Sequence, residues 1–378
     1  MSARLTVAIV GAGIGGLTLA VALQRIGLRP KLFERASALT EVGAGLTLAP
    51  NAMRAYEFLG LAPAIKAASD CPARAALKDF VSGKIRNQLE LARSFHQIHR
   101  ADMQALLINA VTAVDPEAIQ LGQEFAAFDG GYRIRFASGV AAEADLIVGC
   151  DGNRSVVRQA LFGPDRATFL NYVAWRGLVP AADVADVIAE FDSGGYVGSG
   201  RSLIRYRIRN GSLVNYVAFA RKDEWTADSW SIRSTIAELE REFAGGCDDV
   251  LAILRATPPD ASFKWGLIGR PPLEQWTRGH VTLLGDAAHP MLPFLGQGAG
   301  MAIEDAVVLA RALDRYRDLD EALVRYEAAR RPRTTLVTLG ARHSGFRMHG
   351  IDDTETSDAG RQYTEAFVAD YDPAAVAI

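Results

Sequence analysis

The stretch Leu5-Thr-Val-Ala-Ile-Val-Gly-Ala-Gly-Ile-Gly-Gly16 decides the fold of this chain. An apolar run rich in β-branched residues ends at Val10, and a glycine turn follows it and opens an apolar helical pattern that Gly27 closes. Residues 31–34 have the composition of a second strand. A strand, a glycine turn, a helix and a further strand in this order predict a βαβ unit and a parallel sheet.

The glycines of Gly11-x-Gly13-x-x-Gly16 each have a separate task. Gly11 permits the tight turn, Gly13 lets backbone amides approach a pyrophosphate at the helix N-terminus, and Gly16 lets the helix pack on the strand. Glu34 ends the second strand, where a carboxylate can accept hydrogen bonds from an adenosine ribose. The alternative is a glycine-rich turn without a ligand. This motif predicts a bound dinucleotide and leaves NAD and FAD both open.

A second motif, residues 281–305, indicates the other half of a flavin nucleotide. A strand ends at Leu284, and Asp286 stands at its tip, where it can bind a ribityl hydroxyl. Gly296-Gln-Gly-Ala-Gly300 opens a long helix whose unpaired amides and dipole would stabilise the negative charge of a reduced flavin. The alternative is a Gly- and Pro-rich loop that only turns a corner. Together the two motifs predict FAD bound along much of the chain, and therefore redox chemistry.

The composition argues against several other classes of protein. The 378 residues are enough for roughly two to three domains. A net charge of −3 gives no reason to expect nucleic acid or a membrane as partner, and the three cysteines lack metal-ligand spacing. The N-terminal apolar run is short and broken by glycines, which is typical of a strand rather than a signal peptide. We therefore expect a soluble cytoplasmic protein without a metal site.

The motifs as a set resemble those of the class A flavoprotein aromatic hydroxylases, the family of p-hydroxybenzoate, salicylate and 3-hydroxybenzoate hydroxylases. The resemblance covers about residues 5 to 345 and is specific for the family, but not for a substrate. The matching pieces are Gly11 to Gly16 with Glu34, Gly43-Ala44-Gly45 with Pro50-Asn51-Ala52, His99-Arg100-Ala101-Asp102, Cys150-Asp151-Gly152-Asn153-Arg154-Ser155, Trp175-Arg176-Gly177, and Gly285-Asp286 with the loop from Pro293 to Gly298.

The resemblance implies a reaction. NADH or NADPH would reduce FAD, O2 would add to give a flavin C4a-hydroperoxide, and its distal oxygen would pass to a small aromatic substrate. Phenols, hydroxybenzoates and hydroxylated N-heteroaromatics are the substrates implied. Two alternatives stay open: a flavin monooxygenase acting on a non-aromatic or polycyclic substrate, and a flavin oxidoreductase without oxygen insertion. The oligomeric state is also open, with a homodimer as one candidate.

The resemblance also implies roles for single residues. Arg100 and Gln104 would contact the phosphate and ribityl part of FAD. Asp151 and Gly152 would form a turn that serves both FAD and NAD(P)H. The carbonyl of Pro293 would face the substrate, and Tyr206 and Pro293 are the predicted catalytic residues. The predicted cofactor-binding residues are Gly11, Gly13, Ile14, Gly15, Gly16, Glu34, Arg35, Gly45, Arg100, Gln104, Asp151, Gly152, Asp286, Pro293, Gly296, Gln297, Gly298 and Ala299.

The alternation in residues 201–210 predicts a strand with two different faces. One face carries Ser202, Ile204, Tyr206 and Ile208, and the other carries Leu203, Arg205, Arg207 and Arg209. Several relatives have His where Ser202 stands, so the His/Tyr pair that some of them use to deprotonate a phenol is incomplete here. Tyr206 could still bind a substrate hydroxyl, or could simply pack in the sheet. We expect the arginine face to be exposed to solvent rather than to clamp a carboxylate.

Three further residues have two interpretations each. His289 closely follows Asp286, and we expect it to fix the strand-to-helix junction by hydrogen bonds rather than to act in catalysis. Arg154 and Arg158 follow the Asp151-Gly152 turn, where they could form ion pairs or guide the nicotinamide phosphate. Neither interpretation of the two arginines is preferred.

The expected fold is α/β: a doubly wound FAD-binding domain interrupted by a mostly antiparallel β-sheet substrate domain, with C-terminal helices. The FAD-binding domain is predicted to span residues 1–72, 98–167 and 271–345, and the substrate domain residues 73–97 and 168–270. Residues 346–378 form a C-terminal tail. A helical pattern covers residues 319–330, and Arg331-Pro332-Arg333 predicts its end, because proline lacks a backbone N–H.

Overall fold

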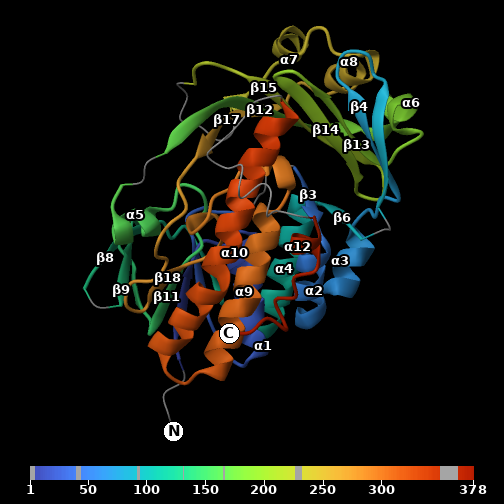
Figure 1. Ribbon diagram of the computed structural model, residues 1–378. Coiled ribbons are helices and arrows are strands. Elements are labelled where there is room, and N and C mark those ends of the chain that lie inside the picture. The colour runs from blue at the N-terminus through green and yellow to red at the C-terminus, as the bar shows by residue number, and fades with distance from the viewer. Residues whose placement is uncertain are drawn as a thin grey trace.

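The computed structural model describes residues 5–39, 44–91, 94–130, 132–164, 167–225, 232–349 and 365–378. A parallel sheet and a mostly antiparallel sheet form two separate parts of the molecule (Figure 1). The long helices α9 (Gly298–Arg315) and α10 (Leu319–Met348) pack on each other, and α10 extends from the parallel sheet to the antiparallel one. The predicted α/β class is confirmed. Within the described ranges, every helix is too short or too polar to cross a membrane.

The parallel sheet contains five strands in the described part of the chain, in the order β18-β11-β1-β2-β7. Their bounds are β1 Val7–Val10, β2 Lys31–Glu34, β7 Ile119–Leu121, β11 Leu146–Gly149 and β18 Val281–Leu283. Strands β1, β11 and β18 are buried along their whole length, as continuous apolar runs in a parallel sheet should be. Because these strands come from distant parts of the sequence, the chain leaves this sheet and returns to it.

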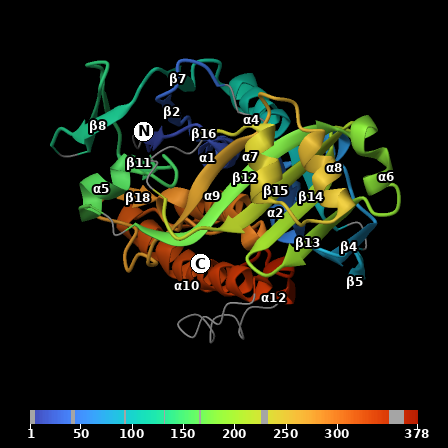
Figure 2. The same ribbon diagram turned by 90° about the horizontal axis from the view of Figure 1, so that it is seen from above.

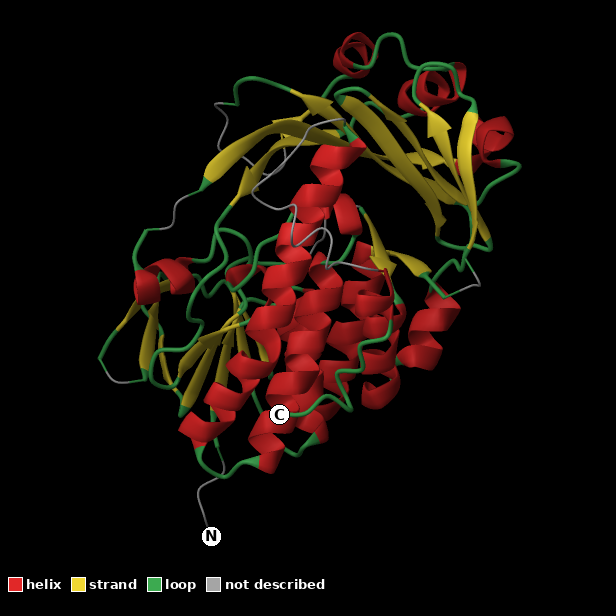
Figure 3. Ribbon diagram, viewed as in Figure 1, coloured by secondary structure: helices red, strands yellow, loops and turns green. Residues whose placement is uncertain are grey.

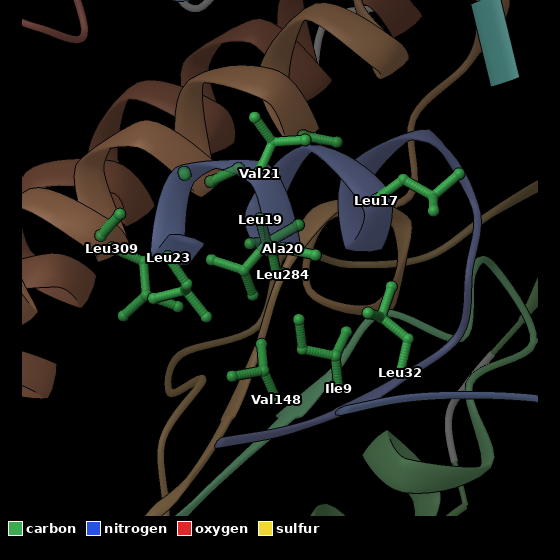
Figure 4. Packing of buried hydrophobic residues seen from close by; sticks show 14 of the residues in the cluster. Ile9, Leu17, Leu19, Ala20, Val21, Leu23, Leu32, Val148, Leu284 and Leu309 are labelled. Atoms are coloured by element: carbon green, nitrogen blue, oxygen red, sulfur yellow. The ribbon is translucent and has the colours of Figure 1, made fainter. Parts of the chain in front are cut away.

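Helix α1 (Ile14–Arg25) packs on this sheet and is covered in turn by α9 and α4 (Arg100–Val114). Its side chains meet Ile9 and Val148 of the sheet and Leu309 of α9 in one apolar cluster (Figure 4). Burying each large aliphatic side chain of this kind stabilises the fold by about 1.5–3 kcal/mol. The glycine turn that precedes α1 is therefore held between a buried strand and a buried helix.

A small antiparallel sheet packs beside the parallel one. In the described residues it has three strands, β8 (Phe125–Phe128), β9 (Arg133–Phe136) and β10 (Ala141–Glu143). Phe136 of β9 stacks on Phe33 of β2, with ring centroids 4.6 Å apart. Since Leu32 faces the α1 cluster, Phe33 and this small sheet lie on the other side of β2.

The larger sheet contains eight strands in the described ranges, in the order β16-β17-β12-β15-β14-β13-β4-β5. Their bounds are β4 Arg74–Asp79, β5 Ile85–Glu90, β12 Thr168–Pro180, β13 Ser193–Gly198, β14 Arg201–Ile208, β15 Leu213–Arg221, β16 Ile232–Arg233 and β17 Phe263–Gly269. All pairings are antiparallel except that of β13 with β4. The predicted strand from residue 201 is therefore present, but it ends at Ile208, and Arg209 begins a turn with a φ of 56°.

Short helices cover the outer face of this sheet (Figure 2). They are η1 (Ala181–Val184), α6 (Ala185–Ile188), α7 (Ile236–Glu242) and α8 (Asp248–Arg255). Our prediction of a solvent-exposed arginine face was wrong. Arg205 is 1% exposed and donates to the carbonyls of Val187 and Phe191 at 3.0 and 2.7 Å. Arg207 donates to the carbonyl of Ile188 at 2.7 Å, because carbonyls at a helix C-terminus have no partner within the helix.

The sequence predicted that helix α10 ends before Pro332. In the structure α10 instead continues past Pro332 to Met348. Four buried charged side chains hold this part of α10 to α9. Arg330 pairs with Glu304 and Asp305 at 2.6 Å each, and Arg333 pairs with Glu304 at 2.8 Å. These contacts on both sides of Pro332 offset the local cost of proline, which is about 3 kcal/mol in a helix interior.

The remaining elements are β3 and β6, which pair as a two-stranded sheet, and several short helices (Figure 3). Their bounds are β3 Gly45–Leu48, α2 Pro50–Leu59, α3 Ala62–Ala68, β6 His96–His99, α5 Val156–Phe162, η2 Gly285–Ala287, η3 Pro293–Leu295 and α12 Glu365–Ala369. The predicted tail packs on the core where it is described: Arg333 donates to the carbonyl of Phe367 at 2.8 Å, and the Tyr316 hydroxyl donates to that of Ile378 at 2.7 Å. The strands of the two large sheets come from the segments that the sequence assigned to the FAD-binding domain and to the substrate domain. The domain boundaries themselves stay a prediction.

Candidate functional site

A cavity of about 560 Å³ lies between the parallel and antiparallel sheets. Three groups of residues from distant parts of the sequence line it. The first group follows β1 in the glycine turn, the second follows β18 and leads into α9, and the third belongs to β3, β6, β13, β14 and β15. Twelve of the residues predicted from the sequence line this cavity: Gly13, Ile14, Gly15, Gly45, Arg100, Gly152, Tyr206, Asp286, Pro293, Gly296, Gly298 and Ala299.

In the glycine turn, the fold requires glycine at positions 11 and 16, whereas Gly13 has open space beside it. Gly11 has a φ of 108°, and a Cβ there would lie 2.4 Å from the carbonyl oxygen of Cys150. A Cβ on Gly16 would lie 2.1 Å from the carbonyl oxygen of Gly11. A Cβ on Gly13 would meet no atom within 4 Å, and Gly13 lines the cavity. The open position is therefore the one at which a phosphate can approach the N-terminus of α1.

Other predicted residues surround this turn without lining the cavity. Glu34 accepts from the backbone amides of Ala12 and Ala36, at 2.9 Å each. The Gln104 side chain lies 3.5 Å from the carbonyl of Ala12, and Arg35 is exposed. Glu34 is thus placed beside the glycine turn at the end of β2, as the sequence predicted.

The two residues of the Asp151-Gly152 turn have different roles. The Asp151 carboxylate accepts from the backbone amides of Val156 and Val157 at 2.7 and 3.0 Å, so it caps the N-terminus of α5. Gly152 lines the cavity with a φ of 80°. Arg158 is 1% exposed and donates to the carbonyls of Ala287 and Asn153 at 2.9 and 2.7 Å. These contacts favour a structural role for Arg158, because its guanidinium holds the loop after β18.

Asp286 stands at the tip of β18, as predicted, with its side chain open to the cavity. Desolvation by the surrounding protein raises the pKa of its carboxyl, against the opposing effect of the charges on His289, Arg100 and Arg158. The helix α9 begins close by, and a Cβ on Gly298 would lie 3.8 Å from the Asp286 carboxylate. One carboxylate and one helix N-terminus therefore face the same space.

His289 fixes the junction between β18 and α9, as the sequence analysis expected. Its Nε2 lies 2.5 Å from the Asp305 carboxylate, which also accepts from the Gly285 amide at 3.0 Å. Burial raises the pKa of Asp305, but the charges of His289 and Arg330 outweigh it and lower the pKa to about 2. The anionic Asp305 thus ties the loop to α9 and α10 at once.

Gln297 was predicted to bind the cofactor, but its side chain points away from the cavity. It is 5% exposed, and its Oε1 accepts from Nδ2 of Asn51 in α2 at 3.2 Å. Gln297 is the N-cap of α9, so what it adds to the site is backbone. The preceding Gly296 has a φ of 62°, a conformation that favours glycine and directs the chain into the helix.

The wall opposite the cofactor loops is made by side chains. The Tyr206 ring packs against Gly45, where a Cβ would lie 2.5 Å from the ring, and its hydroxyl bonds to Thr47. The Gly45 amide donates to the Oδ1 atom of Asn215 at 2.7 Å. Burial raises the pKa of Tyr206, so its hydroxyl keeps its proton and can act as a hydrogen-bond donor. Tyr206 therefore lies where a substrate hydroxyl can be bound.

The sequence missed most of the apolar wall. The residues concerned are Ile204, Val217, Phe219, Met291, Leu292, Phe294 and Met348. Alternation with Tyr206 could have indicated Ile204, but no local pattern marks Phe294 or Met348. The sequence also missed His349, whose Nε2 lies 2.9 Å from the Ser202 hydroxyl. An imidazole from the end of α10 thus reaches Ser202 on β14.

Comparisons with known proteins agree with this geometry. A family model described as FAD binding domain matches residues 4–341. Aurachin C monooxygenase/isomerase of Stigmatella aurantiaca is 36% identical over 354 residues, covering 91% of this chain and 90% of that protein. The 6-hydroxynicotinate 3-monooxygenase of Pseudomonas fluorescens is 31% identical and covers 89% and 90%. Klebsiella pneumoniae HpxO complexed with FAD and uric acid has a TM-score of 0.84 at 26% identity, with 98% and 94% covered.

Proposed function

We propose that this chain, which belongs to the FAD binding domain family and within it to the flavoprotein aromatic hydroxylases, uses NADH or NADPH and O2 to hydroxylate a small aromatic substrate. In the balanced reaction the aromatic C–H, O2, NAD(P)H and a proton give C–OH, water and NAD(P)+. The observation that carries the proposal is the single cavity that joins the glycine turn and the α9 N-terminus to the Tyr206 wall.

The residues present fit FAD from one end to the other. The open position at Gly13 suits the pyrophosphate, and Glu34 beside it suits the adenosine ribose. Arg100 and Asp286 suit the phosphate and ribityl part. The backbone of residues 296–299 offers glycines that allow close approach and the positive end of a helix dipole, which suit the electron-rich edge of a reduced flavin. Gln104, predicted to contact the phosphate and ribityl part, lies 3.5 Å from the Ala12 carbonyl, where it can support the glycine turn.

Bound FAD would supply the redox chemistry, because it can take a hydride from NAD(P)H and react with O2. The protein's task is then to hold and orient the substrate. Tyr206 would donate a hydrogen bond from the sheet wall, and Pro293, whose carbonyl accepts from the Gly296 amide at 3.0 Å, lines the cavity in the loop before α9. The apolar side chains around them exclude water, which would otherwise divert reducing equivalents into hydrogen peroxide.

The proposal is tested by NADH and NADPH oxidation with purified holoenzyme and a panel of phenols, hydroxybenzoates and hydroxypyridines. Peroxide is quantified in parallel, and the product is analysed after reaction under isotopically labelled O2. We expect ligand-stimulated oxidation, little peroxide and one labelled oxygen in the product. A turned-over product without label would contradict oxygen insertion and indicate a flavin oxidoreductase. Turnover confined to non-aromatic or polycyclic compounds would replace the substrate class.

A further inference from the structure

The substrate end of the cavity divides into a polar edge and an apolar remainder. Four side chains make the polar edge, and we call them the polar quartet: Thr47, Gln97, Ser193 and Tyr206. Strand pairing brings them together, since Thr47 lies opposite Gln97 and Ser193 lies opposite Tyr206. Tyr206 bonds to Thr47, and Gln97 Nε2 donates to the Ser193 hydroxyl at 3.3 Å. The quartet is therefore a connected group rather than four scattered residues.

Gln97 carries a buried acceptor that no protein group uses. Its side chain is 4% exposed, and its Oε1 has no hydrogen-bond partner. Leaving such a group unpaired costs about 1–3 kcal/mol, which an N–H or O–H of a bound ligand would recover once the Gln97 amide, which lines the cavity, turns its oxygen towards the ligand. Tyr206, in the same quartet, retains its proton and can donate. The quartet thus offers an acceptor and a donor to one edge of a ligand.

The remainder of this end is apolar. Ile204, Val217, Phe219, Leu292, Phe294 and Met348 form it. Of the described residues that line the cavity, the charged ones are Arg100 and Asp286, and both belong to the cofactor end, where their charges interact. Among the residues that the structure describes, a carboxylate placed at the substrate end would therefore meet apolar side chains and no counter-charge.

Three arginines of the antiparallel sheet do not line the cavity. Arg205 and Arg207 point to the outer face of the sheet and bind carbonyls there. Arg176 stands opposite Val217 in the sheet but does not line the cavity, and its guanidinium lies 5.4 Å from the centre of the Trp265 ring. His349 is uncharged at neutral pH, because burial lowers its pKa, and its two nitrogens face Gly345 and Ser202.

We propose that the substrate is an uncharged hydroxylated N-heteroaromatic ring without a carboxylate. It presents a ring N–H to Gln97 and an oxygen to Tyr206, as the lactam form of a 2-hydroxyquinoline does, and turns its apolar edge to Phe219 and Phe294. A carboxylate is disfavoured because burying an unpaired charge costs far more than the apolar contacts gain. This inference rests on the proposed aromatic hydroxylation and narrows its substrate class.

The first arm of the test compares three ligands on the oxidised holoenzyme by the change in flavin absorbance. The ligands are 2-hydroxyquinoline, 2-hydroxyquinoline-4-carboxylate and 2-naphthol. We expect 2-hydroxyquinoline to bind about 100-fold more tightly than the carboxylate, which differs from it only by the charged group. We expect it to bind about 10-fold more tightly than 2-naphthol, which lacks the ring N–H. The same order is expected for stimulation of NAD(P)H oxidation.

The second arm uses Gln97→Leu, with the exposed Gln88→Leu on β5 as matched control. Gln97→Leu should weaken 2-hydroxyquinoline about 10-fold and leave 2-naphthol unchanged, and Gln88→Leu should change neither. Tighter binding of the carboxylate, lost in Arg176→Met, would overturn the inference and identify Arg176 as a carboxylate clamp, while aromatic hydroxylation would stand. If no aromatic compound of either kind stimulated NAD(P)H oxidation, the proposed function itself would fail.

Discussion

The proposed cofactor end and the proposed substrate end of the cavity are built from different parts of the chain. At the cofactor end the surface is largely backbone: glycines at 13, 15, 152, 285, 296 and 298 line it, and the start of α9 faces it. At the substrate end the surface is side chain, from Tyr206 and Thr47 to Phe219 and Phe294. In this arrangement the backbone conformation would bind the nucleotide that the whole family shares. The substrate would be distinguished by side chains, which can vary without changing the fold.

The largest expected effect comes from breaking the frame that carries the cofactor end. Arg330→Met leaves Glu304 without one of its two buried arginine partners and removes an ion pair from Asp305. Removing one member of a buried ion pair costs about 3–5 kcal/mol, so chemical denaturation should show a loss of that size. Arg325→Met on the same helix removes an exposed pair with Glu321 and a cation–π contact with Tyr316, each worth about 1 kcal/mol or less, so its effect should stay well below that of Arg330→Met. Equal losses of unfolding free energy in both variants would show that the buried ion pairs stabilise the protein no more than an exposed pair does.

The backbone character of the cofactor end can be tested with two identical substitutions. Gly16→Ala places a Cβ 2.1 Å from a carbonyl oxygen and should destabilise the apoprotein by about 1–3 kcal/mol. Gly13→Ala meets no protein atom and should leave apoprotein melting unchanged, but it should lower bound FAD because it fills the phosphate position. Apoprotein melting and FAD content separate the two. Full FAD content in Gly13→Ala would contradict the proposed phosphate site.

The side-chain character of the substrate end predicts smaller effects that spare the cofactor. Gly45→Ala should displace the Tyr206 ring, since its Cβ would lie 2.5 Å away, and raise the KM for the aromatic substrate about 10-fold. Tyr206→Phe removes only the hydroxyl and should raise KM by about 2- to 10-fold. FAD content is the control for Tyr206→Phe and should match wild type. Loss of FAD in Tyr206→Phe would mean that the two ends are not independent.

The smallest predicted effect is an acid sensitivity of the substrate wall. Burial lowers the pKa of His349, although its hydrogen bond to Gly345 opposes this. In the unfolded chain its pKa is near 6.5, so below about pH 6.5 the unfolded state binds a proton that the folded state does not. Stability is therefore present above that pH and falls as the pH drops towards the lower folded value. The melting temperature of wild type should decline more than that of His349→Gln between neutral pH and about pH 5. Parallel declines would exclude His349 as the source.

The sequence predicted most of the parallel part of the fold because the signals there are local. The bounds of β2 agree with prediction, and the helix predicted after the glycine turn is present as α1 and is followed by Gly27 with a φ of 83°. Prediction was weaker where a partner decides the outcome. The sequence placed the end of α10 before Pro332. On both sides of Pro332 the helix is held by the buried partners of Arg330 and Arg333, which lie on α9. These partners are distant in sequence, so no local pattern indicated them. The arginine face of β14 was assigned to solvent for the same reason, since the carbonyls of α6 that cover it have no sequence signature.

By itself, the sequence determined the glycine turn, the strand–loop–helix after Leu284 and the order of the segments. Steric limits on the backbone act within a few residues, so these features depend on local sequence alone. Only the tertiary structure decided which side chains share the cavity: that Gln97 meets Tyr206 through Ser193, that Phe294 reaches the sheet wall, and that His349 comes to lie on Ser202. Such contacts join residues far apart in the chain, and they form only when strand pairing and helix packing have set the distance between them.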